Sequence, residues 1–372
     1  MRCIAILPGT SRVDVVDRPE PPLPGEREVL IEMLECGVCG TDRHIIASGQ
    51  ARPAPGEGAL ILGHEPLGRV LQVGAAVHHL QAGDYVTATN QRSCGHCTPC
   101  AAGEVDLCVS AAGTGRGISG MDGFLRPRLL DDAAFCVRVP SLLAPVAVLT
   151  EPLAVSEKVI AAMRQVQHRL PHSLWVEQAD RPDWAAGLRF AIGGAGPVGA
   201  LAAFALVCHG AEVHVLDRAP VGGAKARVIA ALGAHYHCTE DTDALGVAEA
   251  VGPIDAAVEA SGSGEMCVSL WRALGRNGVM GVVGGARNSD PPIPVGEVFS
   301  RALSRNQALV GSVASNPRHF VLALQDLAAG QARFPAALDG MISERCDFAH
   351  ADAAFAAGHD DDIKRVIRVS GA

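Results

Sequence analysis

Short apolar segments separated by glycine and proline dominate the first 140 residues of the chain. Segments with this pattern are residues 3–7, 13–16, 28–34, 60–62, 68–73, 84–89, 122–130 and 134–139. Apolar and polar positions tend to alternate in them, and turn residues such as Pro8 and Gly9 lie between them. A period of two interrupted by turns is typical of β-strands. The pattern therefore predicts a β-rich first domain of barrel type.

The pattern changes after residue 140, where longer amphipathic stretches alternate with short apolar ones. Helices are expected at residues 142–149, 153–166, 223–232, 243–251, 265–274, 317–329 and 349–358, with a break at Glu151 and Pro152. Strands are expected at residues 189–192, 212–216, 256–259, 278–283, 308–312 and 363–369. This alternation predicts a doubly wound parallel sheet, and so an α/β chain. We expect a first domain at residues 1–156, a second at 157–314, and a C-terminal segment at 315–372 that returns to the first.

A glycine-rich turn follows the strand expected at residues 189–192 and opens a helix. It has the form G-x-G-x-x-G and contains Gly194, Gly196, Pro197, Val198 and Gly199. Asp217 ends the next strand, about 20 residues further on. This context predicts a dinucleotide site in which the pyrophosphate lies at the helix N-terminus. Asp217 favours NAD by accepting hydrogen bonds from a ribose diol, whereas the adjacent Arg218 leaves NADP open.

Four of the 12 cysteines lie close together, at Cys94, Cys97, Cys100 and Cys108. Four thiolates at such spacing can close a tetrahedral shell around one zinc ion, which leaves no position for a substrate. We therefore predict a structural zinc site. The alternative is an iron–sulfur cluster, which normally has a shorter last gap followed by proline.

A second group of metal ligands is divided between two segments of the first domain. Residues 36–44 contain Cys39, Thr41 and His44, and residues 63–68 contain His64 and Glu65. A thiolate, an imidazole and a carboxylate together suit zinc with a position left open for chemistry. This group predicts a catalytic zinc site.

Charge and composition exclude several classes of partner. The formal net charge is −9 and no basic run is present, which argues against nucleic acid. No apolar run is long enough to span a membrane, and no signal peptide is recognisable. The expectation is a cytoplasmic enzyme that acts on a small molecule.

The chain resembles the zinc-dependent medium-chain alcohol and polyol dehydrogenases. The resemblance rests on four features in this order: the β-rich zinc domain, Gly-His-Glu, the four-cysteine lobe and the later dinucleotide fold. Residues 151–158, 309–313 and 362–364 are most similar to the glucose dehydrogenase branch. The resemblance covers nearly the whole chain. It implies a GroES-like catalytic domain, a Rossmann coenzyme domain, two zinc ions per chain and a homodimer or homotetramer. The implied reaction is hydride transfer between an alcohol, most typically a sugar or polyol, and NAD or NADP.

The resemblance also implies roles for single residues around the catalytic zinc. Cys39, His64 and Glu65 would bind the ion, and Glu151 would be a fourth ligand or hold a zinc-bound water. Two other interpretations stay open: Glu65 could instead orient His64, and Glu151 could be an acidic residue favoured at a helix start. Asn90 matches a sugar-contacting asparagine of the branch.

Three further roles concern the proton and the coenzyme. Thr41 stands where the family has a hydroxyl that takes the substrate proton, and His44 where many members pass that proton to solvent. Lys364 matches a basic residue near the coenzyme phosphates. His44 could also be a plain surface histidine and Lys364 a solvated charge. The other histidines, apart from His96 in the cysteine lobe, show no ligand spacing, and we assign them to structure or surface.

Three positions depart from the glucose branch. Gly115 replaces an acidic residue, Ser300 a histidine and Ala314 an asparagine, all of which contact sugar hydroxyls in the relatives. Loss of a built-in hydrogen-bond partner changes substrate discrimination strongly. A small secondary alcohol or a specialised metabolite therefore remains an alternative substrate. An alternative to the dehydrogenase function, from another functional class, is a zinc-stabilised quinone reductase or a relative without catalysis.

Overall fold

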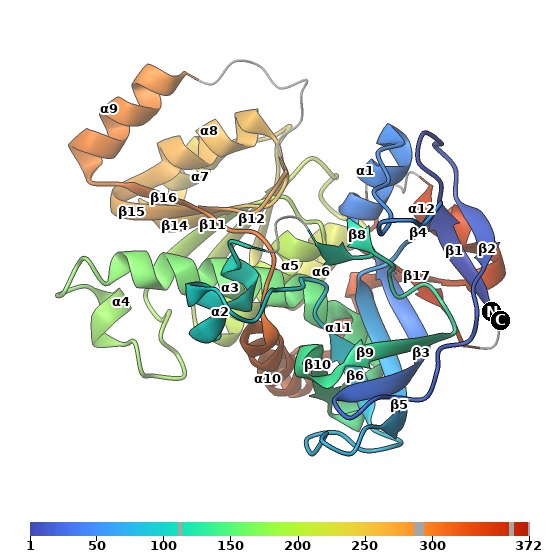
Figure 1. Ribbon diagram of the computed structural model, residues 1–372. Coiled ribbons are helices and arrows are strands. Elements are labelled where there is room, and N and C mark those ends of the chain that lie inside the picture. The colour runs from blue at the N-terminus through green and yellow to red at the C-terminus, as the bar shows by residue number, and fades with distance from the viewer. Residues whose placement is uncertain (111–113, 286–293, 357–360, 371–372) are drawn as a thin grey trace.

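The computed structural model of the chain describes residues 1–110, 114–285, 294–356 and 361–370 (Figure 1). The strands are β1 Arg2–Ile6, β2 Asp14–Asp17, β3 Glu28–Val38, β4 Leu60–Ile61, β5 Glu65–Val73, β6 Tyr85–Ala88, β7 Gly115–Arg116, β8 Gly120–Met121, β9 Arg128–Asp132, β10 Cys136–Val139, β11 Arg189–Gly193, β12 Glu212–Asp217, β13 His235–Cys238, β14 Ile254–Glu259, β15 Leu274–Val282, β16 Ala308–Gly311, β17 Ile342–Asp347 and β18 Lys364–Arg368. The α-helices are α1 Gly40–Ser48, α2 Thr98–Ala101, α3 Thr150–Gln167, α4 Leu174–Glu177, α5 Pro197–Cys208, α6 Ala224–Ala231, α7 Ala244–Val251, α8 Gly264–Ala273, α9 Val295–Arg305, α10 Pro317–Arg333, α11 Pro335–Met341 and α12 Ala351–Phe355. Within the described part of the chain, the 3₁₀-helices are η1 Val105–Leu107, η2 Ala133–Phe135, η3 Ser141–Leu149 and η4 Phe348–His350.

Among the described residues, the N-terminal half is built from two larger sheets, mixed or antiparallel, and a small parallel pair, β7-β8. A three-stranded sheet has the order β2-β1-β4, and a seven-stranded sheet has the order β10-β6-β5-β3-β18-β17 with β9 also paired to β3. Strand β18, from the end of the chain, runs antiparallel to β3, with Arg365 opposite Val38. The last residues therefore complete the sheet that carries the metal-ligand segments.

The second half contains a six-stranded parallel sheet in the order β13-β12-β11-β14-β15-β16. Numbered along the chain, this is the order 3-2-1-4-5-6, in which the direction of winding reverses between β11 and β14. Helices α7 and α8 lie on one face, and α3 and α5 on the other (Figure 1). The doubly wound sheet predicted from the alternation of elements is present, and the glycine-rich turn after β11 lies at its reversal point.

Several elements differ from the expected ones. Strand β13 was not expected, because its four residues, His-Tyr-His-Cys, lack an apolar alternation. Helix α9 was not expected either, and the structure shows no buried residue on it. The break expected at Glu151 and Pro152 is absent: α3 runs unbroken from Thr150, since proline is tolerated in the first helical turn. The end of the helix expected at 349–358 lies outside the described residues.

Helix α3 also crosses the expected domain boundary between residues 156 and 157. It packs on α5, α10 and the strands β15 and β16 of the parallel sheet. Its first turn nevertheless reaches the metal-ligand segments, as described below. Among the described residues, no helix combines the length and apolar character that a membrane span requires.

Candidate active site

The three candidate ligands of a catalytic zinc converge in the first domain. Cys39 precedes α1 as its N-cap, and His64 and Glu65 lie where β5 begins. A ligand atom from each of the three lies within 4.8 Å of the others. Segments about 25 residues apart in sequence thus form one group, as their chemistry predicts.

Asp42 orients this group, although the sequence patterns did not identify it. Its Oδ2 accepts a hydrogen bond of 2.9 Å from the Cys39 backbone N–H, and its Oδ1 lies 3.3 Å from Nδ1 of His64. Metal-binding histidines commonly direct their second ring nitrogen at a carboxylate. Burial alone would lower the pKa of His64, but Asp42 and Cys39 raise it well above its usual value. The pocket therefore favours a positive charge, and a zinc ion fits that preference.

Glu151 faces the same group from the first turn of α3. It is buried, and its Oε1 accepts a hydrogen bond of 2.9 Å from Nδ2 of Asn90. Burial, reinforced by the nearby Glu65, raises the pKa of Glu151 to about 7. The structure does not include Glu151 in the group of mutually close ligand atoms. This contact joins Glu151 to Asn90, the residue that matches a sugar-contacting asparagine of the glucose branch.

Lys364 requires a correction. We expected it near the coenzyme phosphates, but its Nζ is buried and lies 2.7 and 2.5 Å from the two carboxylate oxygens of Glu65. It also donates to the Val38 carbonyl at 3.1 Å. An ammonium has three donors, and these contacts occupy all of them. Lys364 therefore neutralises and positions Glu65 and leaves no donor for a phosphate.

Thr41 and His44 both lie on α1, three residues apart and so on one side of the helix. The Thr41 hydroxyl oxygen lies 3.7 Å from the Cys39 sulfur, at the ligand group. His44 is exposed to solvent. Thr41 at the ligand group and His44 at the solvent thus stand in the order that a proton relay requires.

The four clustered cysteines form a second, separate ligand group. The Cys97 sulfur lies 3.4 Å from the Cys100 sulfur and 3.8 Å from the Cys108 sulfur. The sulfurs of Cys94 and Cys100 are 4.0 Å apart. Tetrahedral zinc with Zn–S bonds of about 2.3 Å would separate its sulfurs by about 3.8 Å. The sulfur positions therefore fit a zinc ion with a closed shell.

The cysteine lobe is tied to the second half of the molecule by buried charges. Asp106 forms an ion pair of 2.5 Å with Lys158 of α3 and accepts a hydrogen bond of 2.7 Å from Asn316, the N-cap of α10. Lys158 Nζ also donates to the Val313 carbonyl at 2.6 Å. These contacts link the lobe to α3 and to the segment before α10, and sequence reasoning did not find them.

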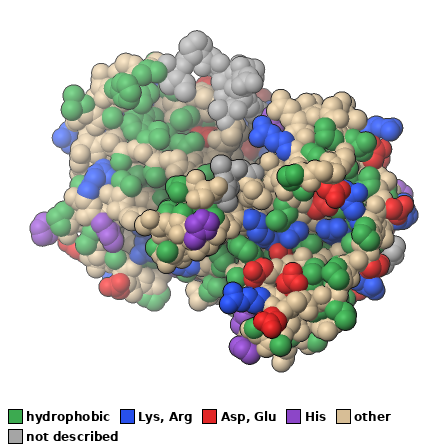
Figure 2. Space-filling model, in the orientation of Figure 1, with side chains coloured by type: hydrophobic (Ala, Val, Ile, Leu, Met, Phe, Trp, Pro, Cys, Tyr) green, Lys and Arg blue, Asp and Glu red, His purple; other side chains and the backbone are tan. Residues whose placement is uncertain are grey.

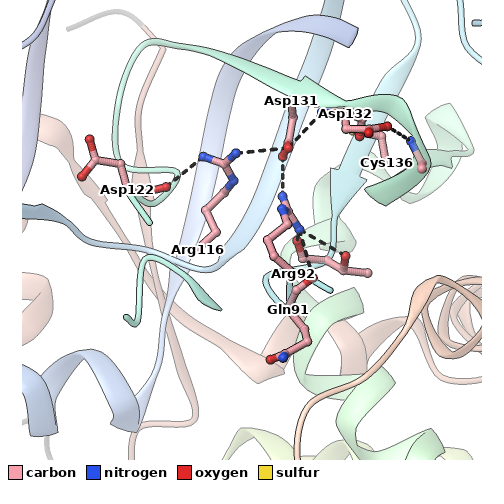
Figure 3. A network of polar contacts seen from close by, with 9 residues as sticks. Gln91, Arg92, Arg116, Asp122, Asp131, Asp132 and Cys136 are labelled. Atoms are coloured by element: carbon pink, nitrogen blue, oxygen red, sulfur yellow. Dashed lines mark hydrogen bonds and ion pairs between the residues drawn. The ribbon is translucent and has the colours of Figure 1, made fainter. Parts of the chain in front are cut away.

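A buried ion network supports the loop that carries Asn90 (Figure 3). Asp131 accepts from Nη2 of Arg92 at 2.6 Å and from Nη2 of Arg116 at 3.1 Å. The backbone N–H of Arg116 donates to the Asn90 carbonyl at 2.8 Å. One carboxylate thus holds Arg92, two residues after Asn90, and Arg116, which adjoins Gly115 and is bonded to the Asn90 backbone. Because these three residues are distant in sequence, no motif revealed them.

The glycine turn between β11 and α5 has two positions that require glycine for protein packing. Gly194 has φ = 95°, and a Cβ at Gly199 would lie 1.9 Å from the Gly194 carbonyl oxygen. Among the described residues, a Cβ at Gly196 would meet no atom within 4 Å beyond its own chain neighbours. The open space above Gly196, at the N-terminus of α5, fits a coenzyme pyrophosphate that must approach the backbone closely. Pro197 and Val198 form the first turn of α5.

Asp217 lies at the carboxyl end of β12, but its carboxylate already has several protein partners. It accepts from the backbone N–H groups of Ala195 at 2.7 Å and Ala219 at 3.0 Å, and lies 3.2 Å from Nζ of Lys225. Arg218 beside it is exposed. Lys225, which sequence reasoning missed, offsets the negative charge that would repel a 2′-phosphate. The structure therefore weakens the sequence argument for NAD over NADP.

The three departures from the glucose branch lie in different settings. Gly115 is buried, and a Cβ there would make ordinary contact with Ile118. Ser300 is exposed on α9. Ala314 has φ = 58°, a left-handed conformation in which asparagine is far more common than alanine. The backbone at residue 314 thus has a conformation that suits asparagine, the residue of the glucose branch at this position.

Comparison with known proteins identifies the family. Residues 144–369 match the family described as "Glucose dehydrogenase C-terminus", and residues 25–141 match "Alcohol dehydrogenase GroES-like domain". The chain belongs to the zinc-dependent medium-chain dehydrogenases, in their glucose dehydrogenase branch. The expected family and fold class, a GroES-like domain with a Rossmann domain, are confirmed.

Similar members of this dehydrogenase family cover essentially the whole chain. The chain is 34% identical to a glucose 1-dehydrogenase of Methanocella arvoryzae, with 99% of both chains covered. It is 32% identical to glucose 1-dehydrogenase 1 of Caldivirga maquilingensis, which covers 100% of this chain and is itself covered to 99%. The structure of Haloferax mediterranei glucose dehydrogenase in complex with NADP, Zn and gluconolactone has 26% identity, full coverage of both chains and a TM-score of 0.86.

Proposed function

We propose that the chain is a zinc-dependent dehydrogenase that oxidises a sugar hydroxyl and reduces NAD or NADP. The observation that carries the proposal is the convergence of Cys39, His64 and Glu65 beside the hydrogen-bonded pair of Asn90 and Glu151. A ligand group with an open side, next to polar groups suited to a hydroxylated substrate, supports redox chemistry on an alcohol.

Each residue of the site has a part in this chemistry. Zinc held by Cys39, His64 and Glu65 would supply a Lewis acid that favours the deprotonated substrate hydroxyl. Thr41 accepts the hydroxyl proton, because its own hydroxyl can accept one proton while donating another. His44, exposed on the same side of α1, releases the proton to solvent.

Glu151 and Asn90 position the substrate side of the site. With its pKa raised to about 7, Glu151 can hold a proton or serve as a ligand near neutral pH. Nδ2 of Asn90 fixes one of its oxygens, and the Arg92–Asp131–Arg116 network holds the Asn90 backbone in turn. The site can thus present a rigid polar wall to a sugar ring.

The coenzyme would lie at the turn around Gly194, Gly196 and Gly199, with its pyrophosphate at the N-terminus of α5. Asp217 and Arg218 would face the adenosine ribose. Because Lys225 offsets the charge of Asp217, we propose that the enzyme uses both NAD and NADP. The structure of the Haloferax mediterranei glucose dehydrogenase is a complex with NADP, which supports the use of NADP.

A sugar is the substrate that the comparisons support best, and the named glucose 1-dehydrogenases point to an aldose oxidised at its anomeric carbon. The direct test measures coenzyme reduction, by absorbance of the reduced nicotinamide, with glucose and other aldoses. Each aldose is paired with its 1-deoxy analogue, and polyols and small secondary alcohols complete the panel. We expect turnover of an aldose and none of its 1-deoxy analogue. Turnover of secondary alcohols alone would contradict the proposal.

The same panel tests the departure at residue 314. Ala314→Asn restores an amide at a left-handed position that asparagine tolerates, so we expect a lower KM for glucose without loss of stability. Ala314→Gly is the matched control, because it relieves the same backbone conformation without supplying an amide. An equal change of KM in both variants would show that residue 314 does not contact the sugar.

We further propose that the chain forms a homodimer or homotetramer in the cytoplasm. Strand β16 is an edge of the parallel sheet and exposes Leu309, and the nearby α9 exposes Phe299 and Leu303. Figure 2 shows hydrophobic side chains gathered over this part of the molecule, at the upper left. An apolar patch beside an open strand edge suits a second copy of the chain. No disulfide joins any of the 12 cysteines, all of which lie among the described residues, and this supports a reducing compartment.

The domain boundaries remain those proposed from the sequence, residues 1–156, 157–314 and 315–372, with α3 as the element they share. This division follows the role of each part: metal ligands in the first, coenzyme turn in the second, and return strands in the third.

A further inference from the structure

A cluster of three histidines and a glutamate lies on the coenzyme domain, away from both zinc sites described above. Its residues come from neighbouring parallel strands: Glu212 and His214 from β12, and His235 and His237 from β13. His214 is directly opposite His235, and Leu216 is opposite His237. Because side chains two residues apart share a face of a sheet, all four point to the same side.

The distances within this cluster suit a metal ion. Ligand atoms of Glu212, His214 and His235 all lie within 4.8 Å of one another. Nε2 of His214 is 3.0 Å from Oε1 of Glu212. Two ligand atoms bound to one tetrahedral ion by bonds of about 2.0–2.1 Å lie about 3.3 Å apart. The distance between the His214 and Glu212 atoms is therefore close to that of two ligands of one ion. The ring of His235 stacks at 4.7 Å on that of His214 and is exposed, so it is free to turn toward the same point.

The groups around these three residues orient them as partners of metal ligands do. Nδ1 of His214 lies 3.0 Å from Nε2 of His237, and a hydrogen bond there leaves Nε2 of His214 as the ligand atom. Arg189 holds the carboxylate of Glu212, with contacts of 3.0 Å to each oxygen. A carboxylate has about four lone-pair sites, so Oε1 still has one for an ion. His214 itself is only 2% exposed and is therefore fixed in place.

We propose that Glu212, His214 and His235 form a third metal site, with His237 as the residue that orients His214. Imidazole with carboxylate favours zinc, nickel or copper over magnesium or calcium. Zinc is the ion we assign, with solvent as the remaining ligand. The bound ion would join the edge strand β13 to β12, the strand that ends in Asp217. Its expected effect is on the stability of the coenzyme domain, and it does not depend on which substrate the enzyme oxidises.

The test is calorimetric titration of the holoenzyme with zinc chloride, after gel filtration has removed loosely bound metal. We expect the wild-type chain to bind one further ion, and His235→Asn to weaken that binding at least about tenfold. Glu212→Gln should weaken it as well. His172→Asn is the matched control, since His172 is also exposed but lies outside the cluster. Its affinity for zinc should equal that of the wild type.

The variants should keep the fold, because His235 is exposed; circular dichroism and dehydrogenase activity in metal-free buffer check this. Excess zinc should raise the melting temperature of the wild type and of His172→Asn, but not of His235→Asn. Uptake of no further ion at millimolar zinc would overturn the proposal. Equal affinity in His235→Asn and the wild type would overturn it too.

Discussion

At the scale of single residues, Lys364 shows how a charge is used inside this site. Its ammonium and the Glu65 carboxylate are both almost completely buried, and each would be costly to bury alone. The pKa of Lys364 is raised, since Glu65 and Cys39 outweigh the effect of burial. Lys364 therefore stays charged and holds the Glu65 carboxylate in place at the ligand group.

Replacement of Lys364 by methionine tests this role. The change leaves the Glu65 carboxylate without a buried partner, which costs about 3–5 kcal/mol of unfolding free energy when no other cation is bound. We therefore expect a lower denaturation midpoint in Lys364→Met, most of all after zinc removal, and weaker zinc retention. Urea denaturation with and without zinc measures both effects.

Arg12→Met is the control, because Arg12 is exposed and its loss should change stability by less than about 0.5 kcal/mol. If Lys364→Met instead kept full stability and raised only the KM for the coenzyme, Lys364 would be a phosphate contact after all.

At the scale of elements, α3 connects the three functional parts of the molecule. Its first turn carries Glu151 at the metal-ligand group, and the hydroxyl of Ser156 donates to the Val198 carbonyl at the coenzyme turn, at 2.9 Å. Lys158, half a turn further, binds Asp106 of the cysteine lobe. These three residues of α3 lie in the segment, residues 151–158, that most resembles the glucose branch. The contacts of Glu151, Ser156 and Lys158 explain why these residues occur at these positions of the helix.

The prediction that the chain forms a homodimer or homotetramer rests on the exposed side chains of helix α9 and strand β16. Leu303 is 87% exposed and Phe299 69% exposed, so a second chain could bury both. We expect Leu303→Glu to shift the protein toward the monomer in sedimentation velocity, because a charge in an apolar interface is poorly solvated. Leu142→Glu is the control: Leu142 is 75% exposed but lies on η3. A wild-type chain that sediments only as a monomer would refute the proposed assembly.

At the scale of the whole molecule, the sequence predicted best what is local. Ligands that are neighbours in the chain, such as His64 and Glu65, and the glycine turn before α5 carry their chemistry in their spacing. The doubly wound parallel sheet, though not its strand β13, followed from the alternation of elements.

Long-range contacts account for most of what sequence reasoning missed. Lys364 meets Glu65 across 299 residues, and Arg92 meets Asp131 across 39. Strand β13 was missed because tertiary pairing with β12, rather than its own composition, makes it a strand. For the same reason its histidines showed no ligand spacing until they lay beside His214. Asp42 was open to detection, since an acidic residue three positions after an N-cap commonly binds the cap backbone.

The central claim is that Cys39, His64 and Glu65 would hold a zinc ion that supplies a Lewis acid to the substrate hydroxyl, while the four-cysteine lobe would hold a separate ion. Its most direct test is the zinc content of wild type and Cys39→Ala, measured by mass spectrometry after gel filtration has removed weakly held metal, together with their aldose dehydrogenase activity. We expect two tightly bound ions in the wild type, and one ion with no activity in Cys39→Ala. A Cys39→Ala variant that keeps two ions and full activity would contradict the account.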